Sequence, residues 1–145
     1  MSERVKVLYD MLEYRRDGHR PEFENSCREW SIIWMDFKVS IDEHADTYSV
    51  VAVRGEVDLH TAPKVQYAIE RAASTDGAVV LDMAGVAFMD STALSALVRA
   101  KDALHEQGIS LRLAAPSKPV ERIFSVTGFR DYFEIFPSRE AAIAG

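Results

Sequence analysis

Residues 78–100 read AVVLDMAGVAFMDSTALSALVRA. The beginning of this stretch is rich in Val and Leu, which is typical of a buried strand, and the pattern predicts a short apolar loop after it. An amphipathic helix is then predicted to begin near Ser91. Its inner face would carry Leu94, Leu97, Val98 and Leu104. An acidic residue and two hydroxyl side chains therefore stand where a strand gives way to a helix.

The same order of strand and helix precedes this stretch. Residues 36–44 alternate apolar and polar side chains, as a half-buried strand does, and residues 48–58 form a denser apolar run that is expected to end at Gly55. A helix is predicted next, because Thr61 can cap it and Pro63 is tolerated in its first turn. The inner stripe of this helix would carry Val65, Ile69, Ala72 and Ala73.

The order continues to the end of the chain. Gly108 is the expected stop of the helix that begins near Ser91, and residues 109–116 read as a further strand. Residues 118–129 predict another helix, whose inner face would carry Val120, Ile123 and Phe124. Residues 132–145 predict a short strand and a last helix capped by Ser138.

Strands that alternate with helices imply parallel pairing through crossovers, so we expect an α/β fold with helices on at least one face of the sheet. The first two strands are joined by residues 42–47, which are few enough for a hairpin, so this pair should be antiparallel and the sheet mixed. Function in such folds concentrates on loops at the carboxyl ends of strands. Two acidic loops, residues 54–61 and 87–92, are expected there.

Composition excludes several classes of function. The chain of 145 residues has 17 Lys and Arg against 23 Asp and Glu, a formal net charge of −6, which is opposite to the basic surface that phosphate backbones attract. The single cysteine, Cys27, allows no intrachain disulfide and fits a reducing compartment. Apolar runs are too short for a membrane span, and the start lacks a signal-peptide core. We therefore expect a cytoplasmic protein that binds neither nucleic acid nor membrane.

Residues 1–34 differ from the rest, and we assign the compact domain to residues 35–145. Apolar residues between positions 5 and 12 have helical spacing, which predicts a short amphipathic helix. The segment is either a regulatory extension or lies upstream of a translation start at Met35, and we favour the start at Met35. The native product would then lack both tryptophans, Trp30 and Trp34, and its intact mass would show this.

Two separated motifs carry a family resemblance. GEVDLHTAP at residues 55–63, followed by VVLDMAGVAFMDSTALSALVRA at residues 79–100, resembles the STAS-domain anti-sigma factor antagonists. Their pattern is a Gly-Glu-aliphatic-Asp turn, a Thr-Ala-Pro helix start and an Asp-Ser-(Ser/Thr)-Gly-Leu motif. The resemblance spans about residues 35–145 and includes the order of strands and helices. It implies a single STAS-like domain with an N-terminal extension.

The resemblance also implies a function. Such a protein binds an anti-sigma factor that is itself a serine kinase, frees a sigma factor, and is switched off by phosphorylation of the serine after the motif Asp. By match this serine is Ser91, with Thr92 as the second candidate, and a phosphoserine phosphatase would reverse the modification. The residues predicted to contact the partner are Glu56, Asp58, Asp90, Ser91, Thr92 and Ser95.

Simpler roles exist for the same residues. Asp90 and Ser91 are common helix caps, and Glu56 and Asp58 fit solvated turn residues. Asp82 reads as a structural acid, and Phe88 and Met89 as core or near-core residues. Ala93 replaces the glycine that the family usually has, and its extra methyl group is expected to weaken recognition by a partner that approaches the backbone closely.

An enzyme is the first alternative from another class. Ser91 does not stand in a Gly-x-Ser-x-Gly elbow, and the histidines that could act as its base are His19, His44, His60 and His105. Of these, only His60 is expected at the end of the sheet where Ser91 lies, and an exposed histidine with no catalytic role is the simpler interpretation. Because motifs for nucleotide hydrolysis or metal binding are absent, we expect no enzyme, no cofactor and no metal. The second alternative is a STAS scaffold that binds partners without phosphorylation.

Overall fold

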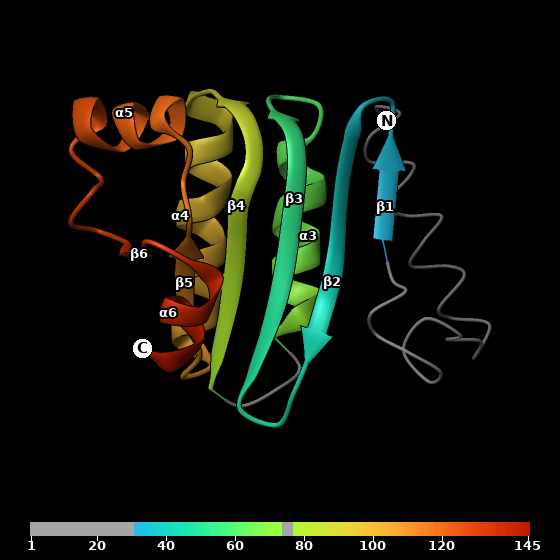
Figure 1. The fold of residues 1–145 in the computed structure, drawn as a ribbon, viewed down its shortest axis with the longest axis vertical. Coiled ribbons are helices and arrows are strands. Elements are labelled where there is room, and N and C mark those ends of the chain that lie inside the picture. The colour runs from blue at the N-terminus through green and yellow to red at the C-terminus, as the bar shows by residue number, and fades with distance from the viewer. Residues whose placement is uncertain (1–30, 74–76) are drawn as a thin grey trace.

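The structure, a computed structural model, describes residues 31–73 and 77–145. The predicted helix between residues 5 and 12, Cys27 and Trp30 lie outside the described residues. Within them, six strands form one mixed sheet in the order β1-β2-β3-β4-β5-β6 (Figure 1). The strands are β1 (Ser31–Trp34), β2 (Phe37–His44), β3 (Tyr48–Val57), β4 (Ala78–Met89), β5 (Ser110–Ala114) and β6 (Glu134–Phe136).

The pairing of the strands confirms the predicted mixed sheet. Strand β2 pairs antiparallel with β1 and with β3, so the connection after His44 is a hairpin as expected. Strands β3, β4, β5 and β6 pair in parallel, each with the next. Every parallel connection contains a helix, as a crossover requires.

Four helices accompany the described strands. They are α3 (Ala62–Ala72), α4 (Ser91–Glu106), α5 (Lys118–Thr127) and α6 (Arg139–Ala144). Helices α3 and α4 lie side by side behind the sheet in Figure 1, and α6 lies in front of it, over β4 and β5. The predicted inner stripe of α3 is buried, and so are Leu94, Leu97 and Leu104 of α4, whereas Val98 is half-buried. Ser138 caps α6 through its side-chain oxygen, which accepts a hydrogen bond from the Ala141 N–H at 3.1 Å.

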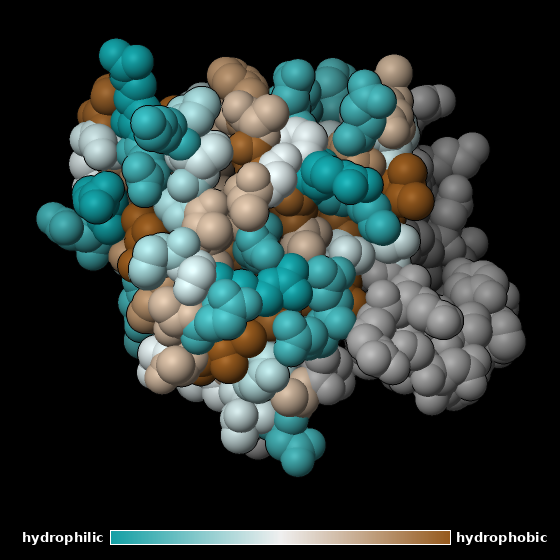
Figure 2. All heavy atoms as spheres, viewed as in Figure 1, coloured by the Kyte–Doolittle hydropathy of each residue, from teal (hydrophilic) through white to brown (hydrophobic). Residues whose placement is uncertain are grey.

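Alternation along β2 and β3 divides the sheet into two faces. Val39, Ile41, Val51 and Val53 belong to the main core with α3 and α4. The residues between them, at positions 38, 40, 42, 52 and 54, therefore project to the opposite face. Figure 2 views the molecule from that side and shows hydrophilic side chains gathered over the middle of the sheet. Helix α6 contacts β4, β5 and β6, so a polar sheet face remains open beside it.

Two strands extend further than the sequence analysis predicted. Strand β4 continues without a loop to Met89, and β3 continues past Gly55 to Val57. The pairing register shifts twice between these strands, after Ala52 and after Gly55, and each shift inserts an extra residue into β4. Such β-bulges let a pair of strands continue with locally stronger twist. The expected apolar loop is thus the last part of a bulged strand.

Strand β1 adds residues 31–34 to the sheet, although the sequence analysis left them to the extension. Ile32 lies in the core. The ring of Trp34 lies 5.7 Å from that of His60, between centroids, and the Lys64 Nζ lies 4.6 Å from the Trp34 centroid. This cation–π contact connects the edge of the sheet to the first turn of α3.

We predict that Gly55→Ala destabilises the protein by roughly 2 kcal/mol or more. Gly55 has φ +108°, and a Cβ there would lie 3.0 Å from the Asp36 carbonyl oxygen in the turn between β1 and β2. Gly108→Ala is the matched control, because Gly108 has φ +76° and nothing within 4 Å of a Cβ, so it should cost only about 1 kcal/mol. Urea denaturation measures both values, and equal losses would show that the close approach to Asp36 contributes nothing.

Candidate functional site

The ends of β3 and β4 bring the two predicted acidic loops together. Val57 and Met89 are paired in the parallel register, and the Asp90 N–H donates a hydrogen bond to the Val57 carbonyl at 3.2 Å. The loop that contains Asp58 therefore begins beside the residue that precedes Ser91. The expected neighbourhood of the two loops is confirmed, and this end of the molecule is the candidate site.

The loop between β3 and α3 is ordered by its own side chains. The Asp58 Oδ1 accepts hydrogen bonds from the His60 N–H at 2.8 Å and the Thr61 N–H at 3.2 Å. The Thr61 hydroxyl donates to the Glu56 carbonyl at 2.8 Å and accepts from the Asp58 N–H at 2.9 Å. Thr61 thus occupies the N-cap position of α3 as predicted, but its side chain closes the loop and makes no capping bond.

Asp90 and Ser91 have separate roles at the start of α4. The Asp90 Oδ1 accepts a hydrogen bond from the Ala93 N–H at 3.0 Å, so Asp90 is the helix cap. Ser91 is the first residue of the helix and is exposed, and its hydroxyl makes no side-chain hydrogen bond to any residue that the structure describes. The cap interpretation therefore accounts for Asp90 and leaves the Ser91 hydroxyl available to solvent.

The neighbours of Ser91 along α4 differ in accessibility. Thr92 is half-buried, whereas Ser95 is exposed and stands one turn further on the same face as Ser91. Ala93 is 0% exposed and belongs to the core. The methyl group that replaces the family glycine therefore points away from solvent, and the expected weakening of close partner approach is not supported at this position.

Large apolar side chains are exposed at the same end, and the sequence analysis missed them. Phe88, predicted to be core or near-core, is 46% exposed, whereas its neighbour Met89 is fully buried. Leu59, in the loop after Asp58, is 53% exposed, and Met35, in the turn between β1 and β2, is 82% exposed. Exposed apolar side chains that gather at one end of a molecule are a feature of interaction surfaces, whereas single ones are common. In the sequence, the only sign that these residues belong to a binding surface is their position next to the two acidic loops.

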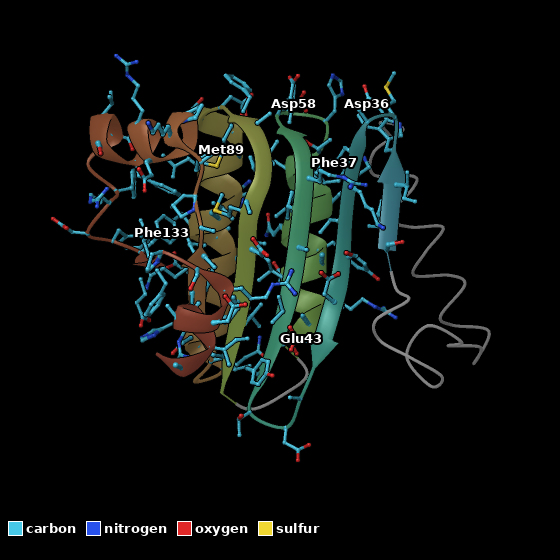
Figure 3. The ribbon with its side chains drawn as sticks, in the orientation of Figure 1. Asp36, Phe37, Glu43, Asp58, Met89 and Phe133 are labelled. Carbon is cyan, nitrogen blue, oxygen red and sulfur yellow. The ribbon has the colours of Figure 1, made fainter. Side chains whose placement is uncertain are left out.

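Acidic side chains complete this surface. Glu56 is exposed, and Asp58 and Asp90 are half-buried at the strand ends. Figure 3 shows Asp58 at the end of β3, with Asp36 at the same end of the molecule and Met89 turned inward. The acids make the surface favourable for a partner with basic side chains, and the apolar residues provide area to bury. We call residues 35, 56, 58, 59, 88, 90, 91 and 95 the switch end.

Other kinds of site receive no support from the described residues. Within residues 31–73 and 77–145, no group of three or more His, Cys, Asp or Glu side chains could hold a metal ion. None of the helices in this part of the chain is long and apolar enough to cross a membrane. Asp82 is a satisfied structural acid as predicted, since its Oδ2 accepts hydrogen bonds from Arg139 and its Oδ1 from the Ala84 N–H. His60 is exposed, as expected of a surface histidine.

Comparisons with known proteins agree on one family. The STAS domain model matches residues 38–142. The chain is 35% identical over 102 residues to the anti-sigma-B factor antagonist of Listeria monocytogenes, which covers 70% of this chain and 90% of the relative. The crystal structure of an anti-sigma factor antagonist from Mycobacterium paratuberculosis has a TM-score of 0.64 and 28% identity, covering 78% of this chain and 97% of that one. The phosphorylated form of the Bacillus protein SpoIIAA shares the fold, with a TM-score of 0.57 and 18% identity, covering 73% and 96%.

The cap of α4 gives a stability prediction. Asp90→Ala removes the acceptor of the Ala93 N–H and should lower the free energy of unfolding by about 1 kcal/mol. Asp90→Asn keeps an oxygen acceptor and should change it by only a few tenths of a kcal/mol. Chemical denaturation measures both variants. An equal loss in the two would assign the stabilisation to the negative charge at the helix start, and no loss in either would contradict the cap.

Proposed function

The chain belongs to the STAS domain family, and from this membership and the geometry of the switch end we propose that it is an anti-sigma factor antagonist. Unphosphorylated protein binds an anti-sigma factor and thereby frees a sigma factor. The Listeria monocytogenes relative, at 35% identity, is named an anti-sigma-B factor antagonist, which supports this role. The protein acts by binding in the cytoplasm and has no catalytic function of its own.

The switch end supports the proposal because it combines an exposed acidic rim with exposed apolar side chains. Leu59, in the loop after β3, and Phe88, near the end of β4, provide exposed apolar area. Glu56 is exposed at the end of β3. A partner surface with basic and apolar residues is complementary to this arrangement. Ser91 and Ser95 extend it along the exposed face of α4.

We assign phosphorylation to Ser91, carried out by the same partner, which is then an anti-sigma factor with serine kinase activity. The single observation that carries this assignment is the exposed Ser91 hydroxyl at the first position of α4, which makes no hydrogen bond to the described residues while Asp90 supplies the cap. Backbone N–H groups and the helix dipole at this position accommodate a phosphate with little cost to the fold. A phosphoserine phosphatase would restore the binding form.

Phosphorylation of Ser91 should abolish partner binding without unfolding the domain. The phosphate adds about −1.5 to −2 charges beside Asp90, in a surface that must lose water on binding. One unpaired charge buried in an interface costs several kcal/mol, and about 3 kcal/mol already weakens affinity more than a hundredfold. Ser91→Ala should stay folded, bind the kinase and resist inactivation by ATP, whereas Ser91→Asp should fold and bind poorly. Calorimetric titration with the kinase measures both, with thermal melts to verify folding.

A matched control separates a local effect from overall charge. Thr47→Asp adds the same charge in the exposed hairpin between β2 and β3, at the opposite end of β3 from the switch end, and should leave affinity unchanged. Mass spectrometry after incubation with kinase and ATP locates the modification. A phosphorylated Ser91→Ala protein would transfer the acceptor role to Thr92. An unmodified wild type that still binds the kinase would favour the phosphorylation-independent scaffold.

The role of Asp58 requires two substitutions, because its carboxylate also orders the loop. Asp58→Asn keeps the Oδ1 acceptor for the His60 and Thr61 N–H groups and removes only the charge. Asp58→Lys reverses the charge and removes the acceptor. If Asp58 meets a basic partner side chain, Asp58→Asn should weaken binding by roughly 1 kcal/mol and Asp58→Lys by more, with unchanged far-UV circular dichroism. Wild-type affinity for both would place this loop outside the interface.

A further inference from the structure

A hollow lies on the open face of the sheet, away from α3 and α4. Its volume is about 260 Å³, and β2, β3 and β4 form its floor. The side chains at its wall that matter here are Lys38, Ser40, Asp42, Arg54 and Asp82. This volume is close to the lower end of the range for small-molecule sites, about 300–1,000 Å³, so an occupant would be small. The proposed switch does not use this hollow.

Two positive side chains line the hollow from neighbouring strands. Lys38 and Arg54 are direct partners in the antiparallel register of β2 and β3, so they share one face of the sheet. Like charges at directly opposite positions destabilise a strand pair. Neither side chain has a hydrogen-bond or ion-pair partner within residues 31–73 and 77–145. Among the described residues, the two cations therefore lack a direct acceptor and stand at opposed positions of one strand pair.

The acidic side chains of the hollow are already occupied. Asp42 accepts hydrogen bonds from the Ser40 hydroxyl at 2.7 Å and from Arg139 Nη2 at 3.0 Å. Asp82 accepts from the Ala84 N–H at 3.0 Å and from Arg139 Nε at 2.9 Å. Burial alone lowers the pKa of Arg139, but hydrogen bonds with Asp42 and Asp82 outweigh it and raise that pKa, so Arg139 stays charged. All four carboxylate oxygens thus have a donor, whereas the two cations have no acceptor in the described part of the chain.

Irregular pairing shapes the hollow on both sides. The β2–β3 register shifts between Ile41 and Glu43, next to Asp42, and the β3–β4 register shifts between Ala52 and Arg54. The second shift sets Arg54 opposite Gly85, where a Cβ would lie 3.1 Å from the Arg54 Cγ. A side chain at position 85 would crowd the Arg54 side chain and require it to shift. Bulges beside functional sites commonly redirect side chains in this way.

We propose that this hollow binds a small oxyanion, a phosphate or carboxylate group of a small molecule, held between Lys38 and Arg54. The planar guanidinium of Arg54 can form two parallel hydrogen bonds to such a group, and the Lys38 ammonium adds a point charge. The bound anion removes the repulsion between the two cations. Binding therefore relieves a cost that the free protein carries, and this relief distinguishes a binding site from an ordinary basic surface.

The test uses full-length protein and inorganic phosphate or acetate as probes, with chloride at the same ionic strength as reference. Amide NMR shifts should localise to β2, β3 and β4 around Lys38, Arg54 and Gly85, and phosphate should raise the melting temperature of the wild type. Arg54→Gln should weaken binding roughly tenfold or more and remove the thermal shift. Without anion it should melt at or above the wild-type temperature, because the like-charge pair is gone.

Arg122→Gln is the matched control, since Arg122 is an exposed arginine on α5 and the same charge is removed. It should bind phosphate as the wild type does. Stronger binding of phosphate than of acetate would identify a phosphoryl group as the preferred ligand, and the reverse order a carboxylate. Equal losses in Arg54→Gln and Arg122→Gln, or shifts spread over the whole surface, would overturn the proposal. So would an Arg54→Gln protein that is less stable without anion and binds phosphate normally.

Discussion

The parallel alignment of β3 with β4 is the constraint on which the rest of the structure depends. It extends from Tyr48 and Ala78 at one end to Val57 and Met89 at the other, and the Asp90 N–H continues it by one hydrogen bond to the Val57 carbonyl. Because both strands end together, the loop closed by Asp58 and the start of α4 at Ser91 have to be neighbours. The same strand pair provides the floor of the hollow between Arg54 and Gly85. Both proposed sites therefore depend on this register, and the hollow depends also on the pairing of β2 with β3 that sets Lys38 opposite Arg54.

Much of this arrangement follows from side-chain periodicity. The alternation of strands and helices, the buried stripes of α3 and α4 and the neighbourhood of the acidic loops could all be predicted, because each depends on which residues are apolar and at what spacing. The bulges in β4 could not. Residues 84–89 are small or apolar throughout, so their pattern gives no sign of where an extra residue enters the strand. The first inserted residue moves the inward-facing positions from 79, 81 and 83 to 86, and the second moves them back, so that Met89 is buried and Phe88 is exposed.

Two further differences come from contacts between residues far apart in the chain. The four residues of β1 are too few for a periodic signal, and they join the sheet through pairing with β2 and through the contact of Trp34 with Lys64 in α3. Thr61 has the right type and position for a helix cap, but its hydroxyl oxygen accepts from the Asp58 N–H in the loop and not from an N–H of α3. In both cases the local sequence allows more than one conformation. Contacts with residues elsewhere in the fold select the one that is observed.

Strand β3 joins the two proposed sites, since Arg54 lies in the hollow and Glu56 lies two residues further on, at the switch end. Residues two apart in a strand project to the same face, and the pairing of both with β4 holds their backbone in place. A ligand at Arg54 therefore has little freedom to change the shape of the switch end. Its effect there would be electrostatic, because a bound anion neutralises positive charge close to an acidic surface and makes that surface more negative. A phosphate on Ser91, as proposed, would also act by adding negative charge, so both proposed sites would modulate one partner interaction through charge on a rigid sheet.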